Sequence, residues 1–240
     1  MANELTVQER MEQLKKRAER VRAIQEVENV FDKFLQYYNL QHKEGMLSCF
    51  ALDEPDVSIE EAYSEVFEGK EKLAEYFDCF RRLAGKTGVL LEQTAVCPVI
   101  EVAGDGETAK LVSFSRGLKG IDAADLQTYT AGRYYADFKK QADGSWKIWH
   151  LHWFVIFDTP VKVGFLNQSI TNKQEWMIPE MADVFTAVAN KPSTYWPVVF
   201  NPNASYDYIP EAPEPYEHYD GMTDQKRTRY LHHMWDRSKY

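Results

Sequence analysis

Two histidines stand two residues apart in a strongly apolar part of the chain. They belong to the stretch from residue 128 to residue 157, which reads TYTAGRYYADFKKQADGSWKIWHLHWFVIF. Side chains along a β-strand point alternately to the two faces of the sheet. On this pattern His150 and His152 share one face with four apolar residues: Trp146, Ile148, Phe154 and Ile156. Polar groups are costly to bury among such neighbours unless they have partners or a function.

An imidazole can take or give a proton near neutral pH, because its ordinary pKa is about 6.5. Two imidazoles about 7 Å apart along a strand could act as base and acid on opposite sides of one small substrate. We therefore predict that His150 and His152 are the catalytic pair, with Tyr38 and Tyr63 as hydrogen-bond donors to a carbonyl or phenolate oxygen. Glu61, if it points inward, would have its pKa raised by burial and become a usable base.

Further residues are predicted to bind the substrate, and several keep a simpler alternative. His42 follows the end of a long helix, so a place in a loop or at the pocket rim is its simplest interpretation. Arg116 could anchor an anionic substrate or form a surface salt bridge. The two strand histidines could instead be hydrogen-bonded core residues, or could bind a metal with Glu61 as a third ligand. The predicted substrate-binding residues are Phe34, Tyr37, His42, Arg116, Tyr134 and Trp146.

The spacing of apolar residues predicts the elements that position these groups. Steps of three and four residues indicate helices, and alternating or continuous apolar runs indicate strands. The predicted helices cover about 7–40, 44–50 and 70–83, and the predicted strands cover about 57–67, 89–102, 109–118 and the two arms of a hairpin through Asp143 and Gly144. This order predicts an α+β fold, in which N-terminal helices pack on a curved antiparallel sheet.

The composition argues against several classes of partner. Lys and Arg total 28 against 37 Asp and Glu, a formal net charge of −9 in a chain of 240 residues. An acidic chain without a basic cluster argues against nucleic acid and against a membrane surface as partners. No apolar run is long enough to span a bilayer, and the first residues lack the apolar core of a secretory signal. The three widely spaced cysteines indicate a reducing compartment, so we predict a cytoplasmic protein.

The chain changes character at Pro160. Eight of the ten prolines lie from this residue onward, among tyrosines and without a regular period. We predict that residues 1–158 form the α+β domain and that residues 159–240 form an extension, which packs on that domain or on a partner subunit. Trp149 and Trp153, assigned to the opposite face of the strand from the histidines, would need such a cover. A homodimer or a higher homo-oligomer is the expected assembly.

Four segments of the first 158 residues resemble the SnoaL-like branch of the nuclear-transport-factor-2-like superfamily. They read FDKFLQYYNLQHKEGMLSCFALDEPD, VFEGKEKLAEYF, GDGETAKLVSF and AGRYYADFKKQADGSWKIWHLHWF, in this order. The resemblance implies a cone-shaped barrel, in which a strongly bent antiparallel sheet wraps around the N-terminal helices and encloses a pocket. Members of the superfamily include dehydratases, polyketide cyclases and ketosteroid isomerase, which usually use no metal, together with many non-catalytic modules.

The match is partial at the positions where dehydratase-like members carry their polar groups. The aspartate expected near the end of the first long helix has no clear counterpart, since Tyr37, Tyr38 and Asn39 occupy that region. The histidine expected before the next strand is also missing, and Gln93 stands near its place. The histidine of the last strand is present as His150.

The residues and the resemblance together predict a cofactor-independent lyase, dehydratase-like or cyclase-like, that acts on a hydrophobic ring compound. An aromatic, polyketide or steroid-like substrate suits the predicted pocket lining. Acid/base groups would remove a proton next to a carbonyl or a phenol, and water or a carbonyl fragment would then leave. The alternative is a non-catalytic module on the same fold that binds a small molecule or serves in assembly, because one fold hosts many functions.

Overall fold

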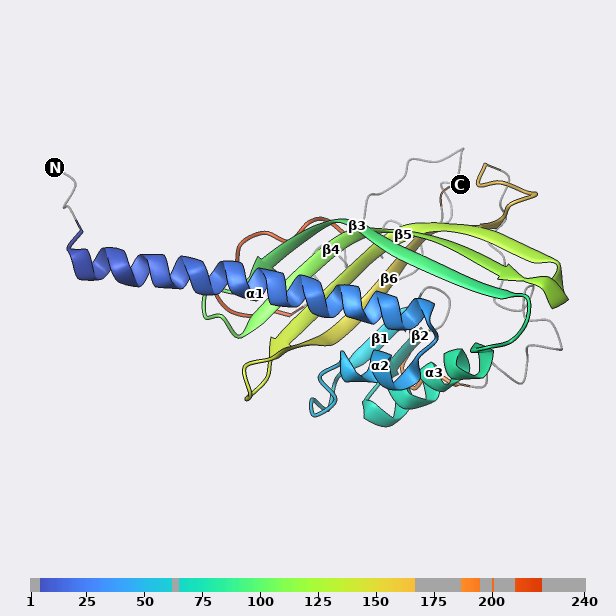
Figure 1. Ribbon diagram of the computed structural model, residues 1–240, viewed down its shortest axis with the longest axis horizontal. Coiled ribbons are helices and arrows are strands. Elements are labelled where there is room, and N and C mark those ends of the chain that lie inside the picture. Colours follow the sequence, from blue (N-terminus) through green and yellow to red (C-terminus); the bar gives the residue numbers. More distant parts are fainter. Residues whose placement is uncertain (1–4, 62–64, 167–186, 195–199, 201–209, 222–240) are drawn as a thin grey trace, which may run out of the picture.

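Three helices precede most of the sheet in the chain and pack against one of its faces (Figure 1). The computed structural model describes residues 5–61, 65–166, 187–194, 200 and 210–221. The helices are α1 (Val7–Asn39), α2 (Lys43–Ser48) and α3 (Lys70–Leu83), and a 3-10 turn covers Asp122–Ala124. None of the helices in these described ranges is long and apolar enough to cross a membrane.

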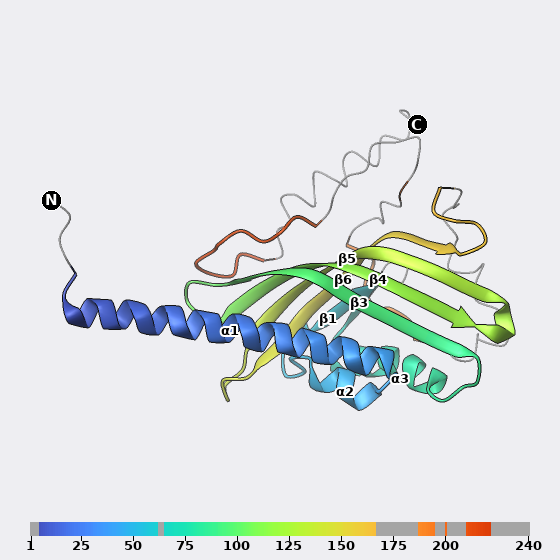
Figure 2. The same cartoon turned by 45° about the horizontal axis from the view of Figure 1, so that its top comes forward.

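The sheet has six strands in the order β2-β1-β6-β5-β4-β3. The strands are β1 (Ser58–Glu61), β2 (Glu65–Glu68), β3 (Val89–Val102), β4 (Thr108–Ile121), β5 (Leu126–Lys140) and β6 (Trp146–Pro160). Neighbouring strands are antiparallel except β1 and β6, which run parallel. Because β2 and β3 are edge strands, the sheet bends around the helices without closing into a barrel (Figure 2). The α+β fold predicted from the sequence is confirmed.

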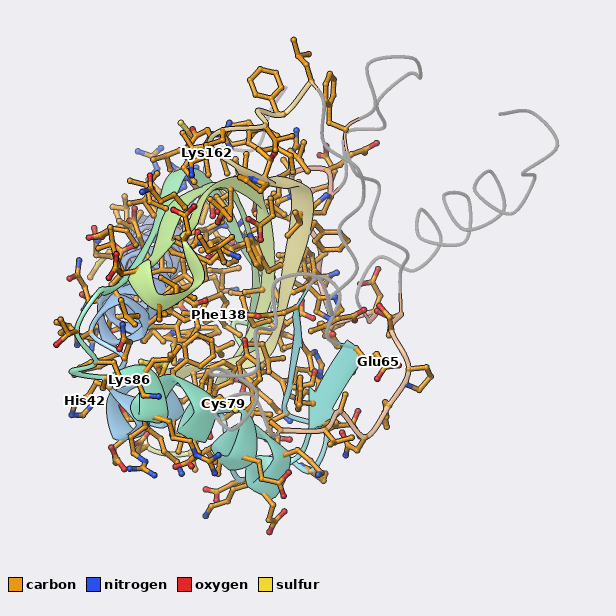
Figure 3. All side chains as sticks on the ribbon, turned by 90° about the vertical axis from the view of Figure 1, so that its right-hand side faces the viewer. His42, Glu65, Cys79, Lys86, Phe138 and Lys162 are labelled. Atoms are coloured by element: carbon orange, nitrogen blue, oxygen red, sulfur yellow. The ribbon has the colours of Figure 1, made fainter. Side chains whose placement is uncertain are left out.

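The core lies between the inner, concave face of the sheet and the helices. Phe31 and Phe34 from α1, Phe77 from α3 and Phe138 from β5 are each at most 2% exposed. Their rings meet at centroid distances of 6.5 Å for Phe31 and Phe138 and 6.2 Å for Phe34 and Phe77. Figure 3 shows Phe138 in the interior, above α3. Truncating a buried phenylalanine to alanine costs about 3–5 kcal/mol, so these rings fix the helices on the sheet.

A β-bulge in β6 changes which of its residues face the core. Ile148 lies opposite Phe138, and His150 lies opposite the next residue of β5, Asp137. Trp149 is therefore an extra residue on β6 without a partner across the strand pair. A second irregularity of register follows farther along β6, where Val155 and Phe157 lie opposite consecutive residues of β5.

The uninterrupted alternation predicted for β6 is wrong beyond Ile148. Ile148 is buried in the core as expected, but the next core residues are Leu151 and Trp153, which strict alternation would place on the opposite face from Ile148. His150 and His152 consequently point to the outer face of the sheet. The physical reason is the bulge, because one inserted residue reverses the facing of the side chains that follow it, here as far as the second irregularity after Val155.

Residues 210–221, called the strap below, run across the outer face of the sheet. The amide of Gly104 donates to the carbonyl oxygen of Tyr216 at 2.9 Å, and Arg133 donates to the carbonyl oxygen of Pro210 at 2.7 Å. The nearly buried Lys110 donates to the carboxylate of Asp220 at 2.8 Å. These contacts tie the strap to the turn between β3 and β4 and to the outer side of β4 and β5. That the whole extension from residue 159 to residue 240 packs in this manner stays a prediction.

Candidate active site on the inner face

A carboxylate ends β1 on the inner face of the sheet. Ile59 is 1% exposed in the core, and the alternation along β1 puts Glu61 on the same face. The charge of Glu61 acts on tyrosines from three other elements: Tyr38 in the last turn of α1, Tyr76 in α3 and Tyr134 in β5. Glu61 therefore points inward, as its position two residues after Ile59 predicts.

The three tyrosines are protonated donors near neutral pH. Burial raises the pKa of Tyr38, Tyr76 and Tyr134, and the negative charge of Glu61 raises each pKa further. Tyr76 is 6% exposed and Tyr134 is 5% exposed, so little water reaches either phenol. A protonated phenol can donate a hydrogen bond to an oxygen that becomes negative, whereas the carboxylate can accept a proton. The inner face thus holds one base and several oxyanion donors close together.

A second set of polar groups joins four strands on the same face. Nε2 of Gln93 donates to the hydroxyl of Thr130 at 3.1 Å. The hydroxyl of Ser115 donates to Oε1 of Gln93 at 3.4 Å and accepts from Nε1 of Trp153 at 3.0 Å. Asn39 makes two hydrogen bonds with the backbone of Gln93. Its Nδ2 donates to the carbonyl oxygen at 2.9 Å, and its Oδ1 accepts from the amide at 2.8 Å. This network fixes the end of α1, which carries the neighbouring tyrosine, to β3.

Two further features shape this part of the inner face. Gly117 lies opposite Gln93 in the strand pair, and a Cβ at Gly117 would come within 2.4 Å of the Gln93 side chain. The glycine therefore leaves the space that the amide group fills. Lys119 and Asp158 form an ion pair at 2.5 Å with exposed side-chain fractions of 18% and 12%. The charge of Asp158 adds to the effects of burial and of the β1 carboxylate in raising the pKa of Tyr38.

His150 lies on the outer face, in a cluster that the strap covers. Its Nδ1 is 3.1 Å from Oδ2 of Asp137, whose side chain is fully buried. Asp137 also accepts hydrogen bonds from the hydroxyl of Tyr135 at 2.7 Å and from the hydroxyl of Tyr219 in the strap at 2.9 Å. The imidazole stacks on Trp149 with the ring centroids 4.3 Å apart. His150 therefore joins the strap to the sheet and does not reach the inner face.

His152 is buried on the outer face as well, beside a second carboxylate. Its Nδ1 is 3.2 Å from Oε2 of Glu60, and the two residues are 1% and 0% exposed. Glu60 also accepts a hydrogen bond from the hydroxyl of Ser193 at 2.8 Å and from the amide of Thr194 at 2.7 Å. The prediction that the two imidazoles lie on the inner face is thus wrong. Each imidazole faces outward and lies beside a buried carboxylate.

Other predicted substrate-binding residues divide between the core and the edge of the molecule. Phe34 and Trp146 are each 2% exposed and pack in the core. The rings of Tyr37 and His42 lie 5.5 Å apart, and Nδ1 of His42 accepts a hydrogen bond from an amide in the first turn of α2. Figure 3 shows His42 at the edge of the molecule, where it caps this short helix.

The remaining predicted residues are Arg116, Tyr63 and those around the inner carboxylate. Arg116, on the outer face of β4, donates to the carbonyl oxygen of the preceding residue at 2.7 Å. Tyr63, predicted as a hydrogen-bond donor, lies outside the described residues. Of the predicted site, the structure brings Glu61, Tyr38 and Tyr134 together on the inner face.

Tyr76 and Ser115 are inner-face groups that the sequence reasoning missed. Tyr76 falls at helical spacing with Leu73, Phe77 and Phe80, so its pattern indicates only a core position. A usable signal was present, because a tyrosine on the buried face of a helix needs a polar partner for its hydroxyl. Ser115 lies in an apolar strand and gives no comparable signal.

Metal binding by the two strand histidines and Glu61 is excluded by their placement, since the sheet separates the imidazoles from the carboxylate. Within the described part of the chain, no group of three or more His, Cys, Asp and Glu side chains is placed to hold a metal ion.

Comparison with solved structures identifies proteins of the same fold. A candidate scytalone dehydratase from Novosphingobium aromaticivorans is 14% identical, with a TM-score of 0.50 over 61% of this chain and 91% of that chain. A nuclear transport factor 2-like superfamily protein from Salmonella enterica is 20% identical, with a TM-score of 0.50 over 60% and 98%. Hexachlorocyclohexane dehydrochlorinase LinA-type3 from Novosphingobium barchaimii is 12% identical, with a TM-score of 0.51 over 60% and 93%. At these identities the likeness concerns the fold.

The sequence comparisons give the family. No curated protein matches the sequence significantly. The model of the SnoaL-like domain matches residues 19–152, which is more than half of the 240 residues and includes Glu61, Tyr76 and Gln93. The resemblance found in the four sequence segments is thereby confirmed, and the chain belongs to the SnoaL-like family.

Proposed function

We propose that the protein is a cofactor-independent lyase or isomerase whose catalytic base is Glu61 on the inner face of the sheet. The observation that carries this proposal is the position of the Glu61 carboxylate among the buried phenols of Tyr38, Tyr76 and Tyr134. A carboxylate can take a proton from a substrate carbon, and the phenols around it can donate hydrogen bonds to the substrate oxygen that becomes negative. In this proposal Glu61, and not His150 or His152, is the group that takes the proton from the substrate.

The reaction begins with removal of a proton from a carbon next to a carbonyl or phenol. The carboxylate of Glu61 takes the proton, and the electron pair of the broken C–H bond moves toward the oxygen, which becomes an enolate. Hydrogen bonds from Tyr76 and Tyr38 stabilise that oxygen. In a lyase the electron pair of the enolate then forms a double bond to the next carbon, and the leaving group departs from that carbon. If the leaving group is a hydroxyl, it gains a proton and departs as water. In an isomerase the proton returns to a different carbon.

A hydrophobic ring compound suits the surroundings of this base. Tyr38 lies against Phe80 with ring centroids 4.8 Å apart, and Tyr134 lies against Trp153 at 6.4 Å. Aromatic walls of this kind bind flat apolar rings, while a few polar groups fix the orientation of the ligand. We therefore propose an aromatic, polyketide-like or steroid-like substrate with one carbonyl or phenol oxygen.

The experiment is a turnover screen with matched variants. The full chain is incubated with cyclic β-hydroxy ketones and phenolic ring compounds in D2O, and water loss and deuterium uptake are followed by mass spectrometry and NMR. For a compound that reacts, Glu61→Gln should lower kcat by about 10²–10⁴-fold, because general base catalysis contributes that much. Glu65→Gln, at an exposed carboxylate in β2, should leave kcat unchanged.

Equal rates for the wild type and Glu61→Gln would overturn the proposed base. The alternative function on this fold is non-catalytic binding of a small molecule. It would be supported if ring compounds protect the protein against thermal unfolding while none of them is converted and none takes up deuterium.

A further inference from the structure

The first half of α1 carries an apolar stripe on a face that does not contact the core. The stripe consists of Val7, Met11, Leu14, Ala18 and Val21, and is called the docking stripe below. Four of these side chains are 77%, 66%, 63% and 67% exposed, in the order Val7, Met11, Leu14 and Val21. Both Figure 1 and Figure 2 show this half of α1 extending past the end of the sheet.

The docking stripe is separate from the face of α1 that holds the helix on the sheet. The core-facing residues are Val27, Phe31 and Phe34, each at most 2% exposed. At 3.6 residues per turn, the docking stripe lies roughly 160° around the helix axis from that face. A groove along the stripe is lined by residues of α1 that include Leu14, Ala18 and Val21. The stripe is therefore available to something other than the core.

The spacing of the stripe is that of a coiled-coil seam. Its residues follow one another at steps of four, three, four and three, which places them at alternating d and a positions of a heptad. Such a seam is narrow and fits the ridge of a single partner helix, whereas a broad apolar face suits a sheet or a membrane. The occupant that matches this shape is an amphipathic helix.

Basic side chains flank the seam on both sides and select the charge of that helix. Arg10 and Arg17 lie at g positions, and Lys15 and Arg22 lie at e positions. Lys15 and Arg22 are 66% and 79% exposed. Arg22 also bonds Glu26 at 2.8 Å within the helix, but exposed pairs of this kind are weak and can be exchanged. Acidic residues on a partner helix would neutralise the basic residues at both the e and the g positions.

A second copy of the same stripe is a poor occupant. In a parallel pair Arg10 of one helix would face Lys15 of the other, and in an antiparallel pair each basic row would face itself. Like charges across a seam disfavour pairing. A membrane surface is also disfavoured, because residues 7–22 hold six basic and three acidic residues while the rest of the chain carries 22 basic against 34 acidic residues, a net charge of −12.

We propose that the docking stripe binds an acidic amphipathic helix of another protein. The probe is a fluorescein-labelled peptide of three heptads with Leu at a and d and Glu at e and g, titrated with the full chain and followed by fluorescence anisotropy. The control peptide has Lys in place of each Glu. The acidic peptide should bind and the basic peptide should not, and binding should weaken at high salt because exposed charges are screened.

Variants of the full chain locate the binding. The double change Met11→Gln and Leu14→Gln should weaken binding at least tenfold, because it removes two exposed seam contacts without disturbing the core. Arg17→Gln should weaken binding a few-fold and reduce its salt dependence. Lys16→Gln, a matched loss of one charge away from the seam, should change neither.

Three outcomes would overturn the proposal. The first is no binding of the acidic peptide, or equal binding of the basic one. The second is a wild-type oligomer that Leu14→Gln dissociates in sedimentation analysis, which would assign the stripe to a second copy. The third is binding to vesicles of phosphatidylserine and phosphatidylcholine that Leu14→Gln abolishes, which would assign it to a membrane. All three measurements are independent of turnover at Glu61.

Discussion

Buried and half-buried tyrosines on both faces of the sheet keep their protons because the structure disfavours the phenolate. On the inner face burial and the charge of Glu61 raise the pKa of Tyr38 and Tyr76. On the outer face burial and the charge of Asp137 raise the pKa of Tyr135 and Tyr219. The protonated phenols on the inner face can therefore donate hydrogen bonds to a substrate oxygen. The protonated phenols on the outer face donate to Asp137, and one of these bonds holds the strap.

These raised values predict a loss of stability at alkaline pH. A tyrosine whose pKa is higher in the folded state stabilises the fold fully below its unfolded pKa of about 10, and this contribution falls as the pH rises above that value. The free energy of unfolding, measured with urea, should therefore be lower at pH 10.5 than at pH 8. Tyr76→Phe should make this decrease smaller. An equal decrease in wild type and variant would show that Tyr76 ionises as readily in the folded protein as in the unfolded chain.

At the same scale, sequence reasoning placed one candidate base correctly and misplaced two. Glu61 follows Ile59 by two residues in a short strand, and no irregularity lies between them. The alternation rule therefore held. His150 and His152 follow the bulge at Trp149, which no residue pattern in that strand announces. Because the neighbours of both histidines are apolar on both faces of the strand, the alternation of polar and apolar residues could not show which face lies in the core.

At the level of secondary structure, the pairing of strands far apart in the sequence determines where the polar groups lie. Strand β1 runs parallel to β6, and this pairing puts Glu60 beside His152 and Glu61 beside Trp153. One short strand thus sends one carboxylate to each face of the sheet. The sequence predicts the strand itself but not its neighbour, because a parallel partner about ninety residues away leaves no local signal.

The buried pair of Glu60 and His152 should contribute to stability as a unit. His152→Ala should lower the free energy of unfolding by about 3 kcal/mol, because it leaves a buried carboxylate with fewer partners. Glu60→Gln in the same chain should recover part of that loss by removing the charge. Urea unfolding of the two single variants and the double variant gives the coupling. Strictly additive effects would show that the imidazole and the carboxylate do not interact.

At the scale of the whole molecule, the strap joins residues far apart in the sequence. Lys110 is 4% exposed at its side chain and binds both the carboxylate of Asp220 and the carbonyl oxygen of Gly221, at 2.8 and 3.0 Å. A composition rich in Pro and Tyr predicts an extended segment that packs on something. It does not predict which face is covered, since the anchoring groups lie on strands 77 to 110 residues earlier in the chain.

Loss of that lysine should release the strap while the cone stays folded. Lys110→Met leaves Asp220 without its buried cation, so limited proteolysis within residues 210–221 should become about tenfold faster, which corresponds to about 1.4 kcal/mol of lost docking. Lys162→Met is the matched control, because its ion pair with Asp125 is exposed and involves no residue of the strap. Equal cleavage rates for both variants would show that the Lys110 contact does not hold the strap.

The hydrogen bond from Lys110 lowers the pKa of Asp220. The pKa of Asp105 is lowered first by a backbone hydrogen bond from Glu107, which does not involve the strap, and then by the side chain of His218, which does. A carboxyl whose pKa is lower in the docked state stabilises docking above its ordinary value of 3.8, and this contribution is lost as the pH falls below that value. Cleavage of the strap should therefore accelerate as the pH falls below about 3.8. A rate independent of pH after correction for the activity of the protease would contradict this.

The proposed function places the reaction on the inner face of the sheet, at Glu61, and not at the outer imidazoles. The most direct measurement compares kcat of Glu61→Gln with kcat of His150→Gln on the first ring compound that the wild type converts. We expect Glu61→Gln to lose at least a hundredfold and His150→Gln to keep most of the wild-type rate. The reverse result, an inactive His150→Gln beside an active Glu61→Gln, would place the reaction under the strap and contradict the proposed role of Glu61.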